Sequence, residues 1–348
     1  MTTLKYKLLG RSGLRVSELA LGTMTFGDDW GWGAPPDEAR RQYEAFREAG
    51  GNFVDTANNY TNGSSEKIVG SLIEGDRPSI VLATKYTLAW RPGDPNGAGN
   101  HRKNMVQSVE ASLKRLGTDC IDLLWLHAWD DTTPPQEVMR ALDDLVRSGK
   151  VLHVGVSDTP AWVVSHANTL ADLRGWSPFV ALQIEYSLIQ RTVERELTPM
   201  ARAFDLAVCG WGAVGGGVLT GKYTRGAAPD AKRDTSSRRT ERNLAIAAEV
   251  DAVADALGTT STRVALAWLR QRSGTVIPIL GARTADQLID ALGSADLTLP
   301  PDSLTRLDQA SAVELGFPHQ FLAMDYVKKL VNGDTVDRFA LDPRRPRL

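Results

Sequence analysis

Four side chains with the chemistry for proton transfer to a carbonyl oxygen are Asp55, Tyr60, Lys85 and His127. A phenol such as that of Tyr60 has a pKa of about 10, too high for ready proton donation at neutral pH unless a nearby cation favours the phenolate. Lys85 can supply that cation, Asp55 can hold its ammonium group, and His127 can donate to a substrate oxygen. This set suits protonation of a carbonyl oxygen as it becomes an alkoxide, while a cofactor supplies the hydride.

Asp55, Lys85 and His127 each end or follow a short apolar run, and such runs recur along the chain. Eight of them, rich in Val, Ile and Leu, occupy residues 19–22, 53–55, 80–84, 121–126, 151–156, 180–184, 206–209 and 276–279. Segments with helical periodicity separate the runs. In residues 134–150, for example, Val138, Leu142 and Leu145 fall on one helix face, and Gly149 is placed as a stop. Continuous apolar runs indicate parallel strands that are buried on both faces.

Eight strand and helix units predict an α/β fold of the (β/α)8 TIM barrel type, with a doubly wound open sheet as the alternative. The barrel is expected over about residues 19–295, preceded by a β-hairpin in residues 5–18 and followed by a C-terminal helical extension over about 300–348, all in one domain. Chemistry collects at the C-terminal ends of barrel strands. The residues found there are Thr23, Asp55, Lys85, His127, Ser157, Gln183, Trp211 and Gly281.

Composition excludes several classes of function. The 348 residues carry a formal net charge of -2, which argues against a nucleic acid partner, and the short basic pair Arg238-Arg239 is typical of solvated surface. Two cysteines, Cys120 and Cys209, form neither a disulfide framework nor a metal-ligand cluster. The absence of long apolar stretches predicts no membrane segment, and we expect a cytoplasmic protein without a metal. The oligomeric state stays open.

A glycine-rich stretch after the seventh run imitates two nucleotide-binding motifs. Residues 210–215 match G-x-G-x-x-G, but no helical periodicity follows, as a Rossmann site requires. Residues 216–223 match a P-loop until Tyr223 replaces the final Ser or Thr. The two matches share a flexible, amide-rich loop with a lysine, which can hold a phosphate by another geometry.

Several motifs of this sequence together resemble the aldo-keto reductase family, over roughly residues 5–315. They are Asp55-Thr-Ala-x-x-Tyr60 with Gly63 and Glu66, Ala83-Thr-Lys85, Leu124-Trp-Leu-His127, Gly155-Val-Ser157, Gln183-Ile-Glu-Tyr-Ser187, Gly217-Val-Leu-Thr-Gly-Lys222 and Gly281-Ala-Arg283. The resemblance implies a barrel that uses NAD(P)H without a Rossmann domain. It makes Tyr60 the general acid, with Asp55, Lys85 and His127 as its partners.

The resemblance also implies a cofactor site. Around the nicotinamide half it places Gly22, Thr23, Met24, Asp55, Ser157, Asp158, Gln183 and the stacking ring of Trp211. Over the pyrophosphate it places Gly212, Val214, Gly216, Leu219 and Lys222, and at the adenosine end Gly281, Arg283, Gln287 and Asp290. A guanidinium forks well onto a phosphate, so Arg283 favours NADPH/NADP+ over NADH, unless it is only an exposed side chain at a helix start.

Four tryptophans in loops after the first, third and fourth runs predict the substrate. Trp30, Trp32, Trp90 and Trp129 can form walls of a pocket for a bulky or ring-containing aldehyde, ketone or alcohol, or can simply pack on neighbouring loops. The leading expectation is therefore an NADPH-dependent carbonyl reductase acting on small molecules. Two alternatives remain: a cofactor-binding regulatory subunit of a channel with little turnover, as in some members of the family, and an aldolase with Lys85 as its Schiff-base lysine.

Overall fold

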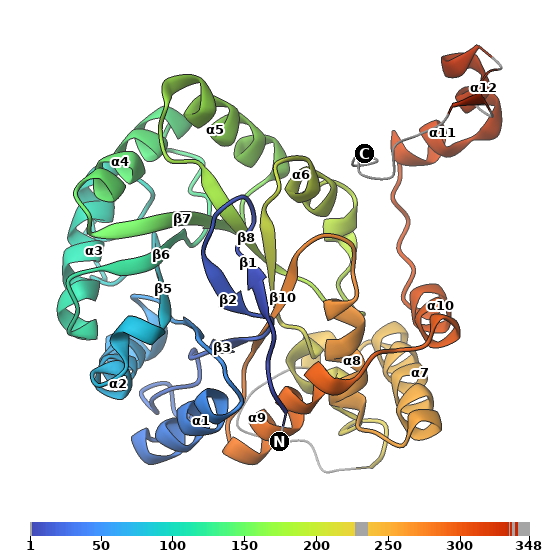
Figure 1. Cartoon of the computed structure of the whole chain (residues 1–348), viewed down its shortest axis with the longest axis horizontal. Coiled ribbons are helices and arrows are strands. Elements are labelled where there is room, and N and C mark those ends of the chain that lie inside the picture. Colours follow the sequence, from blue (N-terminus) through green and yellow to red (C-terminus); the bar gives the residue numbers. More distant parts are fainter. Residues whose placement is uncertain (1, 227–235, 334, 336–337, 340–348) are drawn as a thin grey trace.

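A closed barrel of parallel strands forms the centre of the computed structural model, which describes residues 2–226, 236–333, 335, 338 and 339 (Figure 1). Its strands are β3 (Ala20–Gly22), β4 (Phe53–Asp55), β5 (Val81–Tyr86), β6 (Ile121–Leu126), β7 (Val151–Ser157), β8 (Phe179–Glu185), β9 (Ala207–Trp211) and β10 (Val276–Leu280). They lie in sequence order, and β10 pairs with β3 to close the ring. The predicted (β/α)8 barrel is confirmed, and the open sheet is excluded.

Most strands run one or two residues past the ends of their apolar runs. Lys85 and Trp211 consequently lie within β5 and β9, and not in the loops that follow. The apolar signal stops at the first polar residue, whereas parallel pairing continues, for example between Lys85 and Trp125. These polar residues are therefore positioned by strand backbone.

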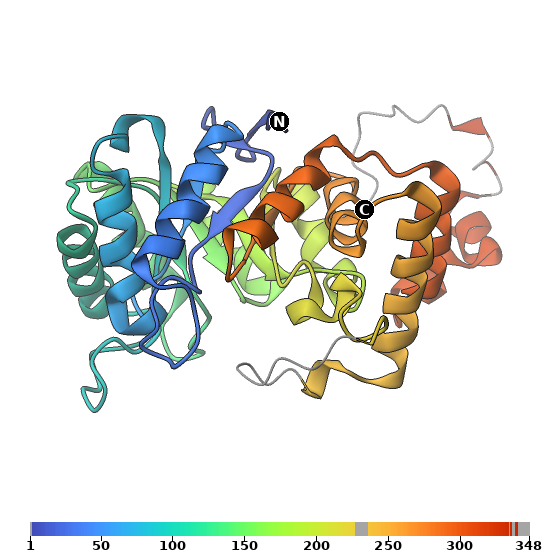
Figure 2. The ribbon, with the colours of Figure 1, turned by 90° about the horizontal axis from the view of Figure 1, so that it is seen from below.

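The N-terminal hairpin pairs β1 (Tyr6–Leu8) with antiparallel β2 (Arg15–Ser17), as predicted. Leu9 and Val16 are fully buried and belong to the apolar cluster that fills the barrel interior. The hairpin therefore closes the N-terminal end of the barrel. In Figure 2 the N-terminus lies at the upper edge, and the long loop after β5 lies at the lower edge, where the mouth opens.

Helices form the outer layer. They are α1 (Pro36–Glu48), α2 (Ser64–Ile73), α3 (Arg102–Leu116), α4 (Pro135–Arg147), α5 (Ala161–Arg174), α6 (Leu197–Ala203), α7 (Glu241–Leu257), α8 (Ser261–Arg270) and α9 (Ala285–Leu292). In α4, proline stands at the first position, Glu137 in the first turn and Arg147 in the last, which suits the helix dipole. Its predicted apolar face, including Val138, Leu142 and Leu145, is buried. No helix among the described residues is long and apolar enough to cross a membrane.

Alternation along the strands decides which side chains enter the barrel. Phe53, Ala83, Trp125 and Cys209 all belong to the interior cluster and form a packed floor. Gly155 is required here, because a Cβ atom at this position would collide with the Trp125 ring. Two residues further along each strand, the next inward positions carry the polar groups of the candidate site.

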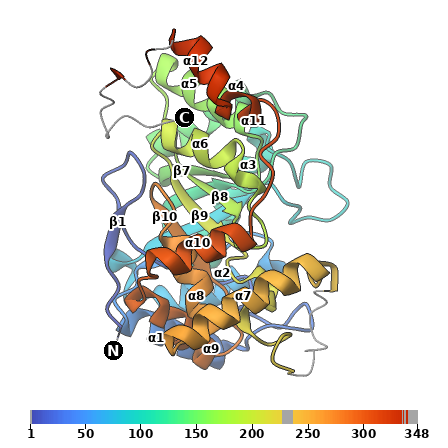
Figure 3. The same ribbon diagram turned by 90° about the vertical axis from the view of Figure 1, so that its right-hand side faces the viewer.

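The C-terminal extension has two parts. Helix α10 (Pro301–Ala310) packs against α7, which keeps it on the barrel. Helices α11 (His319–Ala323) and α12 (Asp325–Asn332) then stand apart at one end of the molecule, beyond α6 (Figures 1 and 3). They lie on the flank of the barrel and not over its mouth (Figure 2). Residues 340–348 of the predicted extension lie outside the described residues.

Candidate active site

Polar side chains from neighbouring strands meet in one layer above the apolar floor. Asp55 ends β4, Lys85 lies in β5, His127 follows β6, Ser157 ends β7 and Gln183 lies in β8, and all five are buried. Because the strands pair in register, for example Ser157 with Gln183, alternate side chains point to the same level of the barrel. The structure therefore brings together the strand-end residues that the sequence singled out.

A buried ion pair forms the centre of this layer. Lys85 Nζ lies 2.5 Å from Asp55 Oδ2 and 2.8 Å from the carbonyl oxygen of Thr56. Gln183 donates from Nε2 to the second carboxylate oxygen, Asp55 Oδ1, at 3.0 Å. Burial alone would lower the pKa of Lys85, but the charge of Asp55 raises it above its ordinary value. Lys85 is therefore a fixed cation at neutral pH.

Tyr60 reaches this cation from the loop after β4, where it begins a short 3-10 helix (Tyr60–Gly63). The Lys85 Nζ atom lies 4.7 Å from the centroid of its ring. Burial raises the pKa of the phenol, and the charge of Lys85 opposes that rise. Lys85 thus acts in the predicted direction, but in the protein without ligands burial outweighs it, so Tyr60 keeps its proton and is poised to donate.

His127 packs edge-on against Tyr60, with ring centroids 5.9 Å apart and an interplanar angle of 80°. Burial and then the charge of Lys85 hold the pKa of His127 well below its ordinary value. The imidazole is therefore neutral at physiological pH, with one donor and one acceptor nitrogen. Its buried Nδ1 atom has no hydrogen-bond partner among the described residues, which leaves hydrogen-bonding capacity for a ligand or a water molecule.

Sequence reasoning missed the hydrogen bonds that hold this layer from behind. Thr84 donates to the fully buried Glu66 at 2.6 Å, and Arg115 of α3 pairs with the other Glu66 oxygen at 2.6 Å. Ser65 donates to the carbonyl oxygen of Thr23 at 2.7 Å and lies 3.0 Å from the Thr56 hydroxyl. Nothing in the sequence indicated the role of Arg115, because its partner lies far away along the chain.

Asn58 was also missed. It is buried two positions before Tyr60, yet neither atom of its side-chain amide has a hydrogen-bond partner among the described residues. The Oδ1 atom of the adjacent Asn59 is in the same state. Buried amides normally find partners, so these two positions retain unused capacity beside the proposed acid. Their position next to Tyr60 was the only signal in the sequence.

The nicotinamide end of the expected cofactor site fits the residues present. Ser157 Oγ is buried and has no partner in the described part of the chain, so it can bond a carboxamide. Gly22 allows β3 to pack closely against β10, since a Cβ atom there would lie 2.6 Å from the Ile279 side chain. Thr23 is buried and Met24 is partly exposed beside it. Gln183 donates one amide N–H to Asp55, and its second N–H and its carbonyl oxygen can also bind a ligand.

The loop after β9 suits a phosphate. Left-handed backbone occurs at Gly212, Gly215, Gly216, Gly217 and Gly221, a conformation that turns successive amides and favours glycine. Residues Gly215–Thr220 form a 3-10 turn interrupted by these glycines, and no α-helix starts there, which agrees with the rejection of a Rossmann site. Val214 and Leu219 belong to this turn region, and Lys222 follows it, with Nζ 5.0 Å from the Tyr223 ring centroid.

A hydrogen bond and a second ion pair fix the barrel rim around Trp211. Trp211 donates from Nε1 to Asp158 Oδ1 at 3.2 Å, and Asp158 adopts a left-handed backbone with φ of 40°. Glu185 lies one residue past the end of the sixth apolar run. It ends β8 and forms an ion pair with Arg238. Arg238 is therefore anchored at the barrel rim, and its interpretation as plain solvated surface was wrong.

The expected adenosine end lies at α9, but two of its residues already have protein partners. Gln287 Oε1 accepts from the Arg283 backbone at 3.0 Å, and Asp290 bonds Thr260 and pairs with Arg263 at 2.9 Å. Gly281 is exposed, and Arg283 is partly exposed just before the N-terminus of α9. Arg283 thus lies where a helix dipole also favours a phosphate.

The tryptophans lie in different surroundings. Trp30 and Trp32 are partly exposed and contact each other, with ring centroids 5.7 Å apart. Trp90 donates to Asn104 at 3.0 Å. Trp129 packs against the apolar cluster under the outer helices. This position favours a role of much of its ring in packing and not in binding substrate.

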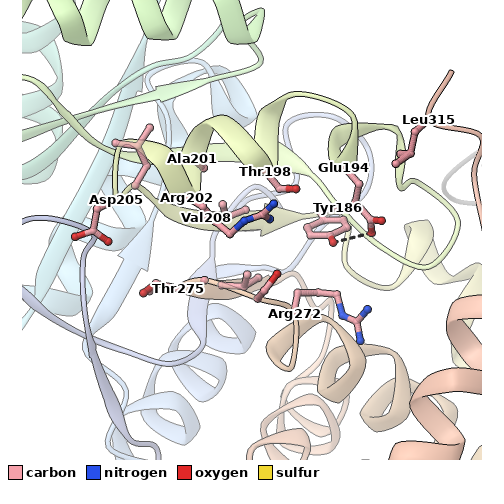
Figure 4. A pocket seen from close by; sticks show the side chains of 14 residues that line it. Tyr186, Glu194, Thr198, Ala201, Arg202, Asp205, Val208, Arg272, Thr275 and Leu315 are labelled. Carbon is pink, nitrogen blue, oxygen red and sulfur yellow. Dashed lines mark hydrogen bonds between the residues drawn. The ribbon is translucent and has the colours of Figure 1, made fainter. Parts of the chain in front are cut away.

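A separate hollow of about 410 Å³ opens on the outer wall, between α6 and the turn before β10 (Figure 4). Its lining includes Tyr186, Arg202, Arg272 and Leu315, and Tyr186 donates to Glu194 there at 2.8 Å. No residue of the polar layer lines it. No group of His, Cys, Asp and Glu in the described part of the chain could hold a metal ion.

The Lys85–Asp55 pair generates a stability prediction. Asp55→Asn leaves a buried ammonium without its counterion, so we expect a loss of about 3–5 kcal/mol in the free energy of unfolding at neutral pH. Asp55 raises the pKa of Lys85, so in the wild type this contribution is present below about pH 10 and is lost as pH rises through the folded-state pKa. In Asp55→Asn, burial lowers the pKa of Lys85 instead. The difference in the free energy of unfolding between the wild type and the variant should therefore become smaller as pH rises.

Urea unfolding of the wild type and of Asp55→Asn, at neutral and alkaline pH, measures this difference in stability. Asp172→Asn is the matched control, because Asp172 pairs with Arg11 on the surface at 3.3 Å, where a loss of at most about 1 kcal/mol is expected. Equal losses in the two variants would contradict the burial argument.

Comparison with known proteins agrees with this geometry. The model of the Aldo/keto reductase family matches residues 18–312. Norsolorinic acid reductase of Emericella nidulans is 38% identical over 321 residues, covering 89% of this chain and 82% of its own. Aryl-alcohol dehydrogenase [NADP(+)] of Phanerodontia chrysosporium is 37% identical over 334 residues, covering 88% of this chain and 86% of its own. The chain belongs to the aldo/keto reductase family and is an oxidoreductase that acts on carbonyl and alcohol groups.

Proposed function

We propose that this protein reduces ring-containing aldehydes or ketones with NADPH, and oxidises the corresponding alcohols in reverse, with Tyr60 as the general acid. The observation that carries the proposal is the buried Lys85–Asp55 pair beneath Tyr60. A phenol next to a permanent cation can release its proton to a nearby oxygen, because the cation stabilises the phenolate that remains.

The chain's own residues fill distinct roles in this reaction. A bound nicotinamide cofactor supplies the hydride. Tyr60 donates its proton to the carbonyl oxygen, Lys85 stabilises the phenolate, and Asp55 keeps the ammonium in place with help from Gln183. His127 is neutral and can hydrogen-bond the same oxygen, which orients the carbonyl toward Tyr60.

The same contacts argue against a Schiff-base lysine. An amine must be neutral to attack a carbonyl, whereas Asp55 raises the pKa of Lys85 and keeps it charged. The Lys85 Nζ atom is also committed to Asp55 and to the Thr56 carbonyl. No observation favours a purely regulatory role.

Two observations support the finer assignments. Arg283 lies just before the N-terminus of α9, which suits the 2′-phosphate of NADPH, and a relative carries NADP(+) in its name. For the substrate, relatives are named for norsolorinic acid and aryl alcohols. The contacting pair Trp30 and Trp32, in the loop after β3, can cover one side of a flat ring.

Tyr60→Phe tests the chemistry. We expect kcat for an aryl aldehyde to fall by about 100-fold to 10,000-fold, because the proton donor is lost, while cofactor affinity stays the same. Steady-state NADPH oxidation and fluorescence titration measure the two quantities. Tyr6→Phe is the control, because Tyr6 lies in the N-terminal hairpin and its hydroxyl donates to the Gly50 carbonyl oxygen. Near wild-type turnover in Tyr60→Phe would refute the assignment.

Arg283→Ala tests the cofactor preference. Loss of a charge-assisted contact to the 2′-phosphate should weaken NADPH binding by roughly 10-fold to 100-fold and leave NADH binding almost unchanged. Isothermal titration with each cofactor gives both dissociation constants. Arg174→Ala, an exposed arginine at the end of α5, serves as the control. An equal loss for NADH and NADPH would show that Arg283 does not contact the 2′-phosphate.

Trp30→Ala tests the substrate class. Removing one aromatic wall should cost about 1–3 kcal/mol of transition-state binding for a ring-containing aldehyde and little for a three-carbon aldehyde. The measurement is kcat/KM for both substrates. Trp176→Ala is the control, because Trp176 precedes β8 at the opposite end of the barrel. If both substrates lose the same factor, Trp30 belongs to the scaffold.

A further inference from the structure

The C-terminal arm, defined as residues 316–333, exposes a dense set of large apolar side chains. They are Phe317 (85% exposed), Phe321 (43%), Leu322 (54%), Met324 (46%), Tyr326 (55%), Leu330 (76%) and Val331 (73%). Monomeric proteins rarely leave contiguous apolar patches of more than a few hundred Å² in water. This surface is therefore expected to have a partner.

Four of the exposed side chains, Phe317, Phe321, Tyr326 and Leu330, form one strip. Phe317 and Phe321 have ring centroids 6.3 Å apart, and Phe321 and Tyr326 meet edge-on at 6.4 Å. Leu330 lies one helical turn beyond Tyr326 on α12, so it extends the same face. Val327, the residue after Tyr326 on α12, is buried, and α11 and α12 contact each other. The arm is thus a small packed unit with one apolar face left open.

The described polar contacts hold the arm at its root and do not cover this strip. His319 lies 3.0 Å from Glu196, which joins the arm to the segment leading into α6. Just before the arm, Arg195 of the same segment donates to the Glu314 carbonyl at 2.9 and 2.6 Å. Because the arm stands on the flank, away from the mouth, its apolar face does not line the active site (Figures 1 and 2).

We propose that the arm is a dimerisation element, in which the apolar face of one arm packs against the same face of a second copy about a two-fold axis. Aromatic side chains bury about 150–250 Å² each, so at the exposures above Phe317, Phe321 and Tyr326 offer roughly 300–450 Å². A standard interface buries about 800 Å² per partner. The three rings therefore supply about half of that area, and Leu330 adds to it.

The charges of α12 select an antiparallel pairing. Asp325 lies in its first turn, whereas Lys329 lies in its last turn. Lys328 reaches Asp325 of the same helix at 3.3 Å, and Lys329 has no ion-pair partner within the described residues. An antiparallel arrangement places Asp325 of each copy near Lys329 of the other and opposes the helix dipoles, whereas a parallel one would bring like charges together.

A two-fold arrangement through the arms is self-complementary and closed, so it ends at a dimer. It also leaves both barrel mouths open, because the arms meet on the flank. The dimer therefore does not require any residue of the polar layer, and its test is independent of the catalytic assignments.

Sedimentation velocity of the full chain over the micromolar range tests the proposal. We expect a wild-type dimer, and a dissociation constant raised by at least about tenfold in Leu330→Glu, because a charge enters the apolar strip. Leu173→Glu is the matched control: Leu173 is 79% exposed on α5, so the control should stay dimeric. Unchanged aldehyde turnover in both variants shows that the barrel remains folded.

Charge exchange tests the orientation. Lys329→Asp should weaken the dimer, and adding Asp325→Lys should restore it, since each copy then offers the reversed pair. A monomeric wild type, or a dimer that persists unchanged in Leu330→Glu, would overturn the proposal. A monomer that binds phosphatidylserine vesicles through the arm would also overturn it, because the strip would then cover a lipid surface. So would a monomer in which Leu330→Glu alters kcat/KM, because the strip would then cover the mouth of its own barrel.

Discussion

A buried charge that must keep its counterion is the constraint on which the rest of this structure depends. The Lys85 ammonium is fully buried inside the barrel, and it persists there only because Asp55, the Thr56 carbonyl and the barrel walls fix its surroundings. Gln183 then fixes the carboxylate from the opposite strand. A charge held in this way gives the neighbouring phenol and imidazole their protonation states. Burial and the cation together lower the pKa of His127 and keep it neutral, whereas burial raises the pKa of Tyr60 against the effect of the cation and keeps it protonated.

The layer below makes this arrangement possible. Trp125 fills the barrel interior and Gly155 yields the space for it, so the polar layer lies on a dry floor. The hairpin residues Leu9 and Val16 close the opposite end. Water therefore reaches the ion pair only from the mouth, where a cofactor and a substrate would displace it. A low-dielectric floor strengthens each interaction above it, which is the physical reason for building such a site in a barrel.

Behind the polar layer, hydrogen bonds join it to the outer helices. Glu66 of α2 accepts a hydrogen bond from Thr84 of β5 and pairs with Arg115 of α3. The strand that carries Lys85 is therefore held by two helices at once. The rim is fixed in a similar manner, where Arg238 pairs with Glu185 at the end of β8. The C-terminal arm differs from both. Its contacts with the barrel are few and polar, and its apolar face is open, which suits association and not catalysis.

The sequence by itself determined the barrel and most of the polar layer. Eight apolar runs identify parallel strands, because burial on both faces leaves no room for alternation, and strand ends in a barrel must converge. Asp55, Lys85 and His127 could therefore be placed on one rim from local pattern alone. The motif around Tyr60 added the acid.

Tertiary structure decided what depends on pairing between distant segments. Gln183 is bonded to Asp55, and Asp290 is committed to Thr260 and Arg263, since hydrogen-bond partners follow from the register of the strands and the packing of the helices. Trp129 packs under the outer helices for the same reason. The pKa of Tyr60 also depended on the fold, because the sequence shows a nearby cation but not the burial that opposes it. Local pattern determines which groups arrive at the rim, and only packing decides what each of them contacts there.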